Sequence, residues 1–219
     1  TDQIVSIGKK ENWVVKDIAE TETKRTPRPP FITSTLQQAA SSRLGMSPSN
    51  SLRVAQNLYV TGHITYMRTD SIILSSTAIT QIKNIIEKKF GAELFTARVF
   101  TKKSKNAQEA HEAIRPTKLN IESAGETEQE KKLYELIWQR TVSSQMKDAK
   151  ISKTKIFVKV GNDKIPDFSI IGARIIYPGW FLADPRARSE ESELPKVLAG
   201  EILKLLEIKT EEKETQPPS

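Results

Sequence analysis

Residues 26–30, TPRPP, place three prolines within five positions, and no other stretch of this sequence restricts the backbone as strongly. Proline fixes one backbone dihedral and has no amide hydrogen, so it is excluded from helix interiors and from central strands. The segment therefore predicts a boundary. On its N-terminal side the residues have the composition of strands, and on its C-terminal side apolar residues recur at the spacing of helices.

Strand-like patterns occupy both ends of the chain. β-Branched or alternating apolar residues predict strands over 3–7, 12–25, 154–160 and 166–183, and one more strand pair or a short amphipathic stretch over 194–214. The simplest architecture is an α+β fold with two domains. Residues 1–25 and 151–219 would together form a discontinuous β-rich domain, and residues 26–150 would form a mostly helical domain inserted into it.

The inserted segment contains start and stop signals for helices. Capping residues predict helices that begin near Ser34 or Thr35, Ser47, Ser75 or Ser76, and Thr127, and glycines predict that the first three end near Gly45, Gly62 and Gly91. A short strand is expected over 63–67. Helix, turn, helix and strand in this order are the outline of a helix-turn-helix or winged-helix unit.

The excess of basic over acidic side chains is confined to the same segment. The net charge is +7, and residues 26–150 hold 18 basic and 11 acidic side chains, whereas the two ends are balanced. This distribution indicates a polyanion-binding domain within a neutral scaffold, although a merely soluble basic surface would give the same count. The absence of cysteine and the presence of only two histidines exclude thiolate and histidine-rich metal sites.

Residues 62–71, GHITYMRTDS, carry the first candidate chemistry. If residues 63–68 form a strand, Tyr66 and Arg68 lie on one face with Ile64. A phenol oxygen can attack phosphorus, and a guanidinium can bind the non-bridging oxygens of a phosphodiester. Asp70 and Ser71 would orient Arg68 or begin the next turn. The pattern alone leaves a second interpretation open, in which Tyr66 is a core aromatic and Arg68 pairs with Asp70.

Residues 109–117, EAHEAIRPT, form a second polar cluster. A short helix is expected over 106–114, and on a helix His111 and Arg115 would share a face because they are four residues apart. The pair would then make a phosphate clamp with one titratable member. An exposed, salt-bridged helix end is the alternative interpretation.

The segments ITYMRTDS and AHEAIRPT together closely resemble the bacterial type IA DNA topoisomerases. The resemblance also covers PPFITSTLQQAASSRLGMSPSNSLRVAQNLY and LYELIWQRTVSSQM, in the order of that family and over nearly the whole chain. It implies that Tyr66 is the nucleophile and Arg68 the catalytic arginine. It further implies DNA-binding roles for six residues: Gln56, Thr65, Asp70, Ser71, His111 and Arg115.

The resemblance implies a Mg²⁺-dependent, ATP-independent transesterase that cleaves single-stranded DNA through a 5′-phosphotyrosine link and relaxes negative supercoils. A monomeric, cytoplasmic and nucleoid-associated protein is expected, with residues 1–25 and 151–219 forming an arch. Two departures stand out: Val60 replaces the usual acidic residue, and no D-x-D metal motif occurs. The chain is therefore expected to be a fragment that lacks the Mg²⁺-binding Toprim domain, and that binds DNA without relaxing it. A non-catalytic winged-helix DNA-binding protein is the alternative, and a purely structural arch is a third.

Overall fold

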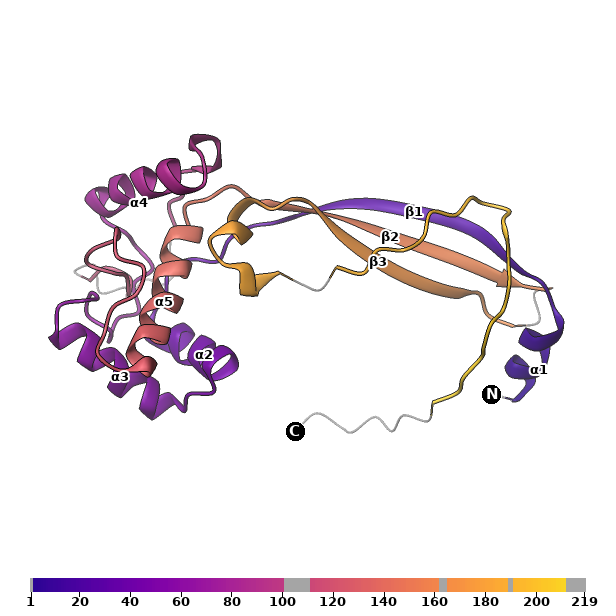
Figure 1. Ribbon diagram of the computed structural model, residues 1–219, viewed down its shortest axis with the longest axis horizontal. Helices are drawn as coiled ribbons and strands as arrows, with labels where there is room; N and C mark the ends of the chain where they lie inside the picture. Colours follow the sequence, from indigo (N-terminus) through magenta and orange to yellow (C-terminus); the bar gives the residue numbers. More distant parts are fainter. Residues whose placement is uncertain (1, 101–110, 162–164, 189–190, 212–219) are drawn as a thin grey trace. The chain divides into compact units, whose positions relative to one another are not determined.

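The structure is a computed structural model, and it describes residues 2–100, 111–161, 165–188 and 191–211. The chain divides into two compact units. The β unit consists of residues 1–23, 151–176 and 190–219, and the helical unit consists of residues 24–150 and 177–189 (Figure 1). The expected α+β class is confirmed. None of the described helices is long and apolar enough to cross a membrane.

The β unit is built on one four-stranded sheet. Its strands are β1 (Trp13–Arg25), β2 (Ala149–Val160), β3 (Phe168–Tyr177) and β4 (Ile202–Leu203), in the order β3-β2-β1-β4. β4 pairs antiparallel with the start of β1, where Trp13 lies opposite Leu203. The alternation in β2 buries Ile156, Val158 and Val160, as the sequence pattern predicts.

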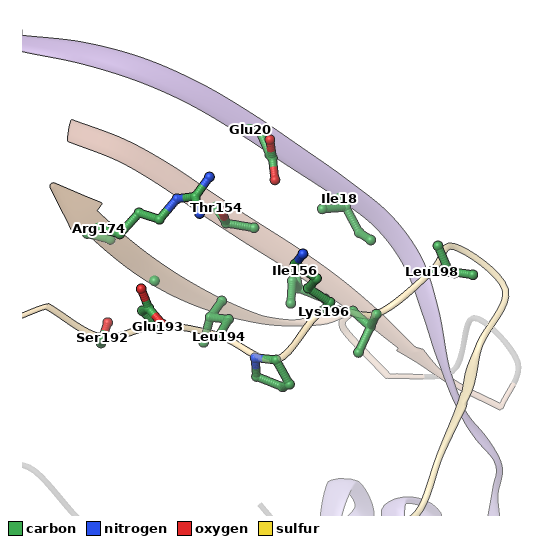
Figure 2. A pocket seen from close by; sticks show the side chains of 14 residues that line it. Ile18, Glu20, Thr154, Ile156, Arg174, Ser192, Glu193, Leu194, Lys196 and Leu198 are labelled. Carbon is green, nitrogen blue, oxygen red and sulfur yellow. The ribbon is translucent and has the colours of Figure 1, made fainter. Parts of the chain in front are cut away.

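Residues 191–200, which have no helix or strand, cross the sheet. Ser192 forms an isolated antiparallel bridge with Ala173 of β3, with N–O distances of 3.0 and 3.1 Å. Gly172 allows this close approach, because a Cβ atom there would lie 2.5 Å from Leu194 Cγ. Between this segment and the sheet lies a cavity of about 430 Å³ with a mixed polar and apolar lining (Figure 2).

Two strand predictions in this unit are wrong. Residues 3–7 belong to helix α1 (Asp2–Lys10), in which Ile4, Ile7 and Gly8 recur at helical spacing and are shielded from solvent. A five-residue β-branched run does not by itself distinguish the two structures. Residues 212–214 of the last stretch lie outside the described residues, and within 194–211 the only strand is the two-residue β4, so the strand pair is not formed there.

The helical unit contains the helices α2 (Thr33–Leu44), α3 (Pro48–Val60), α4 (Ser76–Lys89) and α5 (Glu128–Ser143), together with the short 3-10 helices η1 (Ala92–Leu94), η2 (Gly179–Leu182) and η3 (Pro185–Ala187). Ser47, Ser75 and Thr127 accept amide hydrogens at the starts of α3, α4 and α5, so these predicted caps are confirmed. α2 begins one or two residues earlier than predicted, with Ile32 as its N-cap residue.

Helix α5 is the centre of this unit, and it packs against α2, α3 and α4. The apolar side chains Leu133, Leu136, Ile137 and Val142 of α5 are all buried. Tyr134 is also buried, and its hydroxyl donates a hydrogen bond to the Ile121 carbonyl at 3.0 Å. Burial raises the pKa of Tyr134 to about 12.

Residues 177–189 group with the helical unit, although the sequence pattern assigned them to the β-rich domain. The Trp180 indole N–H donates to the Arg25 carbonyl at 2.8 Å, and the Trp180 amide donates to the Lys147 carbonyl at 3.0 Å. The strand expected up to residue 183 ends at Tyr177, because Pro178 and Gly179 begin η2. Gly179 has φ +48°, a conformation that favours glycine.

Replacing Gly179 by alanine is expected to lower the free energy of unfolding by about 2–4 kcal/mol, through backbone strain and steric overlap. A methyl group there would overlap the Asp148 carbonyl and would lie 2.6 Å from the Lys147 oxygen. Gly45→Ala is the matched control, because Gly45 has φ +66° with no atom within 4 Å of a Cβ position. Urea unfolding of both variants measures the difference, and equal losses would contradict the steric argument.

Candidate active site

Tyr66 lies in a loop that follows α3, and the strand predicted over 63–67 is wrong. Only Ile64 forms a β-bridge there, an isolated one with Pro116. Ile64 and Met67 are both buried although they are three residues apart, which strict alternation does not allow. Ile64, Tyr66 and Arg68 therefore do not share a face: Ile64 is in the core, whereas Tyr66 is 37% exposed.

The C-terminal side of the Tyr66 loop is fixed by Thr33, the first residue of α2. The Thr33 hydroxyl donates to the Met67 carbonyl at 2.8 Å and accepts the Thr69 amide at 3.0 Å. The Thr33 amide also donates to the Thr69 carbonyl at 3.0 Å. The start of a helix thus holds the backbone immediately after Tyr66.

The N-terminal side of the same loop is fixed by Thr65. Its hydroxyl donates to the Ala113 carbonyl at 2.7 Å and accepts the Arg115 amide at 2.9 Å. The Thr65 amide donates to the Arg115 carbonyl at 2.9 Å. The backbone is therefore held on both sides of Tyr66, and the predicted DNA-binding hydroxyl of Thr65 is used inside the protein.

The Tyr66 ring lies against two other exposed rings. Its centroid is 5.2 Å from that of Tyr59, in an edge-to-face arrangement, and 5.9 Å from that of His111. The Tyr66 hydroxyl has no hydrogen-bond partner in the described part of the chain. Tyr59 is 39% exposed, and its ring packs against that of Tyr66. The structure thus brings Tyr66 and His111 together, as the site prediction requires.

The polar residues after Tyr66 have separate environments. Arg68 is exposed and has no ion-pair or hydrogen-bond partner among the residues that the structure describes, so it is not paired with Asp70. Asp70 is exposed as well. Ser71 is buried, and its hydroxyl accepts the Ile73 amide at 3.2 Å. Ser71 therefore shapes the turn, as one alternative predicted, and its hydroxyl does not face solvent.

The helix predicted over 106–114 is wrong for the part that is described. Residues 106–110 lie outside the described residues, and residues 111–113 are not helical. The Ala113 amide donates to the Ile73 carbonyl, and Ile114 forms a β-bridge with Phe31. These long-range partners take the backbone groups that a helix would need. His111 and Arg115 consequently do not share a helical face.

Arg115 is held by Glu112 and is not a free cation. Its guanidinium forms two hydrogen bonds to Glu112 Oε2, at 2.5 and 3.1 Å, and a third to the Pro116 carbonyl at 2.9 Å. Glu112 Oε1 accepts the amide of Ser75, the N-cap residue of α4, at 2.7 Å. Sequence reasoning missed this role of Glu112, because its partner Ser75 is 37 residues away. The predicted phosphate clamp of His111 with Arg115 is thus replaced by an internal ion pair.

The stability contribution of Glu112 is expected to depend on pH. Partial burial raises the pKa of Glu112, but the hydrogen bonds from Arg115 and Ser75 outweigh it, so the pKa is lowered from 4.5. The contribution is therefore present above pH 4.5 and is lost as the pH falls through the lowered pKa. Glu112→Gln should cost about 1–2 kcal/mol at pH 7 and progressively less below pH 4.5.

Urea unfolding of the wild type and of Glu112→Gln at pH 7 and pH 3 measures this difference. Glu135→Gln is the control, because Glu135 is exposed on α5 and, among the described residues, its carboxylate accepts only the Gln139 side-chain amide. A cost of Glu112→Gln that is the same at both pH values would contradict the assignment.

Gln56 lies on α3 one helical turn before Tyr59, so the two side chains project on the same side of the helix. Its side chain is half-buried, and it has no hydrogen-bond partner in the described residues. No group of three or more His, Cys, Asp or Glu side chains in the described ranges is arranged to hold a metal ion. The residues that the structure describes therefore do not fit a Mg²⁺ site.

The whole chain is similar to known proteins. A family model described as DNA topoisomerase matches residues 2–219. The chain is 42% identical to DNA topoisomerase 1 of a Synechocystis species over 236 residues, and 39% identical to that of Campylobacter jejuni over 230 residues. It covers 26% and 32% of these two proteins, which in turn match 100% and 99% of the chain. The chain thus spans about a quarter to a third of their length.

A solved structure agrees with these matches. Full-length topoisomerase I from Thermotoga maritima aligns with 93% of this chain, with a TM-score of 0.78 and 32% sequence identity, and the match covers 34% of that protein. The agreement of family model, sequence relatives and structure extends over both units of the fold. The chain therefore belongs to the bacterial type IA DNA topoisomerase family.

Proposed function

We propose that this chain carries the nucleophile of an enzyme that cleaves and rejoins single-stranded DNA, and that the nucleophile is Tyr66. The observation that carries this proposal is the state of the Tyr66 side chain. Its hydroxyl is free of hydrogen bonds in the described residues, while the backbone on both sides is fixed by Thr33 and Thr65. A fixed backbone with an uncommitted, partly exposed hydroxyl suits a group that must meet a substrate.

In the proposed reaction the Tyr66 hydroxyl gives up its proton, and its oxygen attacks the phosphorus of a phosphodiester. The P–O3′ bond breaks, the phosphate on the 5′ side of the next nucleotide becomes joined to Tyr66, and the departing O3′ takes up a proton to become a hydroxyl. Rejoining is the reverse reaction, in which that hydroxyl attacks the phosphotyrosine. One phosphodiester is exchanged for another, so no ATP is consumed. Passage of a second strand through the break would relax negative supercoils.

Arg68 and His111 are the proposed partners of Tyr66 on the DNA. Arg68 is exposed and unpaired in the described residues, so it can bind the non-bridging phosphate oxygens and stabilise the charge that develops on them. His111 is exposed beside the Tyr66 ring and can contact the strand next to the scissile phosphate. We further propose that Gln56 contacts DNA from α3. Thr65, Ser71 and Arg115 would act by holding the loop.

We propose that the whole protein requires Mg²⁺, but that the described residues of this chain do not bind the metal. Bound Mg²⁺ would offset the negative charge around the phosphate. Because this chain offers no fitting carboxylate cluster in its described part, we place the metal ligands in a Toprim domain outside the 219 residues. The whole protein is proposed to act as a monomer on negatively supercoiled DNA.

End-labelled DNA tests the proposal. The chain is mixed with the Mg²⁺-binding domain of a relative, Mg²⁺ and a single-stranded oligonucleotide, and the reaction is stopped with denaturant. A 5′-phosphotyrosine link predicts that a 3′-end label stays on the protein and that a 5′-end label leaves on a fragment with a free 3′ hydroxyl. Retention of the 5′-end label would contradict the proposed polarity, and retention of neither label would favour a non-catalytic DNA-binding protein.

The chain alone is expected to bind single-stranded DNA weakly and to leave a supercoiled plasmid unrelaxed. Binding would rest on the positive charge of residues 26–118, which hold 13 basic and 5 acidic side chains. For three or four phosphate contacts, the logarithm of the binding constant should fall with the logarithm of salt concentration at a slope of about −2 to −3. Fluorescence anisotropy from 50 to 200 mM salt measures the slope, and a slope near zero would contradict electrostatic binding to the DNA phosphates.

A further inference from the structure

The helical unit contains a second cationic feature, which shares no lining residue with the Tyr66 site. It is a cavity of about 350 Å³, formed where the start of the unit, the end of α2, α5 and the η2–η3 segment meet. Its charged lining consists of Arg25, Arg28, Arg43, Arg140, Arg186 and Asp184. These residues are drawn from four separate stretches of the sequence.

The charges of this cavity do not balance. Among the described residues, Asp184 is the only carboxylate that lines it, and this residue is 2% exposed. Arg43 Nη1 binds both Asp184 oxygens, at 2.8 and 3.0 Å. One carboxylate is thus occupied by one guanidinium. The other four arginines of the lining have no acidic partner within the cavity, which leaves a concentrated positive field.

Arg140 is the most unusual member of the cluster. It lies on α5 and is only 5% exposed, with its guanidinium 4.2 Å from the centroid of the Phe31 ring. Its one hydrogen bond is a long one, 3.5 Å to the Pro29 carbonyl. No fully enclosed side-chain nitrogen or oxygen in the described residues lacks a partner. The remaining Arg140 nitrogens are therefore not fully enclosed by protein, and Arg140 is one of the residues that line the cavity.

The lowered pKa of Arg140 agrees with this geometry. Burial, together with the nearby Arg28 and Arg43, lowers the pKa of Arg140 to about 10, while Asp184 opposes this shift. A buried cation that lacks a partner is costly, and an anion in the cavity would remove much of that cost. Arginine guanidinium groups that converge from several elements match the oxygens of a phosphate group.

We propose that this cavity is a binding site for a phosphate group, distinct from the site around Tyr66. The ligand is either a small phosphate anion or a backbone phosphate of a nucleic acid strand, and both present the same oxygens to the arginines. The proposal goes beyond the cleavage chemistry and does not depend on it.

The Trp180 indole provides a local reporter of binding. Trp180 lines the cavity, is 6% exposed, and donates its indole N–H to the Arg25 carbonyl. The chain has three tryptophans, so its ¹H–¹⁵N spectrum should show three indole signals, and Trp180→Phe identifies the relevant one. We expect pyrophosphate at low ionic strength to shift the Trp180 signal in a saturable manner and to leave that of Trp13 in the β unit unchanged.

Two exposed arginines of the lining allow a test that does not disturb the core. Arg28→Gln with Arg186→Gln should weaken pyrophosphate binding at least tenfold, because charge-assisted hydrogen bonds are lost. Lys88→Gln with Lys132→Gln removes the same charge from exposed positions of α4 and α5, outside the cavity, and should change binding less than twofold. An unshifted Trp180 signal, or equal weakening by both double variants, would overturn the proposal.

A parallel titration with a twelve-nucleotide single strand identifies the source of the phosphate. If the strand shifts the Trp180 signal at lower concentration than pyrophosphate does, and the Arg28→Gln, Arg186→Gln variant loses that shift, the cavity binds the nucleic acid backbone. If pyrophosphate alone shifts the signal, the cavity binds a small anion. If neither ligand shifts it, the proposal fails. Because the readout is binding at Trp180, its outcome is separate from that of the end-label experiment.

Discussion

Replacing Tyr66 by phenylalanine is expected to abolish the covalent protein–DNA adduct, with a loss of at least about 10³-fold in the rate of adduct formation. The substitution removes only the hydroxyl, which has no hydrogen-bond partner in the described residues. The ring contacts with Tyr59 and His111 would remain. Folding and DNA affinity should therefore be unchanged within experimental error, so that any loss reports on the chemistry alone.

Tyr59→Phe is the matched control for this experiment. Tyr59 has nearly the same exposure as Tyr66, 39% against 37%, and the two rings are in contact. If the adduct arises from Tyr66, Tyr59→Phe should retain it, and digestion of the trapped complex should give a nucleotide-bearing peptide that contains Tyr66. An adduct that persists in Tyr66→Phe, or one that disappears in Tyr59→Phe, would show that the nucleophile is assigned to the wrong residue.

The parts of the fold that could be predicted from sequence are those that local chemistry determines. Ser47, Ser75 and Thr127 start their helices because each side chain accepts an amide hydrogen three residues later. The strand predicted over 63–67 failed for the opposite reason. The backbone there is held by Thr33 and Arg115, which lie 30 or more residues away, and no local pattern encodes such partners.

The residues of the candidate site were easier to predict than their arrangement. The residue pattern made Tyr66 and His111 candidates, the resemblance assigned their roles, and the structure places their rings together. Arg115 was selected in the same way, yet Glu112 holds it inside the protein. An arginine that will bind a ligand and one that holds a loop look alike in a sequence, because the difference lies in where the nearest carboxylate is placed.

The charge count indicates which region of the sequence is basic, but it does not indicate where in the fold the charged side chains gather. It located the basic excess in residues 26–150. The arginine cavity, however, also uses Asp184 and Arg186, which lie in the electrically balanced C-terminal part of the sequence. They reach it because Trp180 fixes the η2–η3 segment in the helical unit. Composition by segment cannot detect a site that three segments build together.

Arg68→Ala is expected to slow adduct formation at saturating DNA by about 10²–10³-fold, the range found when a group that stabilises transition-state charge is removed. Arg68 is exposed and has no partner in the described residues, so its loss should leave the free energy of unfolding unchanged. Arg68→Lys should restore the rate only in part, because an ammonium group keeps the charge but loses the paired hydrogen bonds of a guanidinium.

The decisive comparison for Arg68 is between rate and affinity. If it stabilises charge that develops only during the reaction, the rate falls and the dissociation constant for DNA changes by no more than about threefold. Arg53→Ala removes the same charge from an exposed position of α3 and should affect affinity alone. If Arg68→Ala behaves like Arg53→Ala, Arg68 is a phosphate contact of the bound strand, and the stabilisation of the developing charge must come from another group.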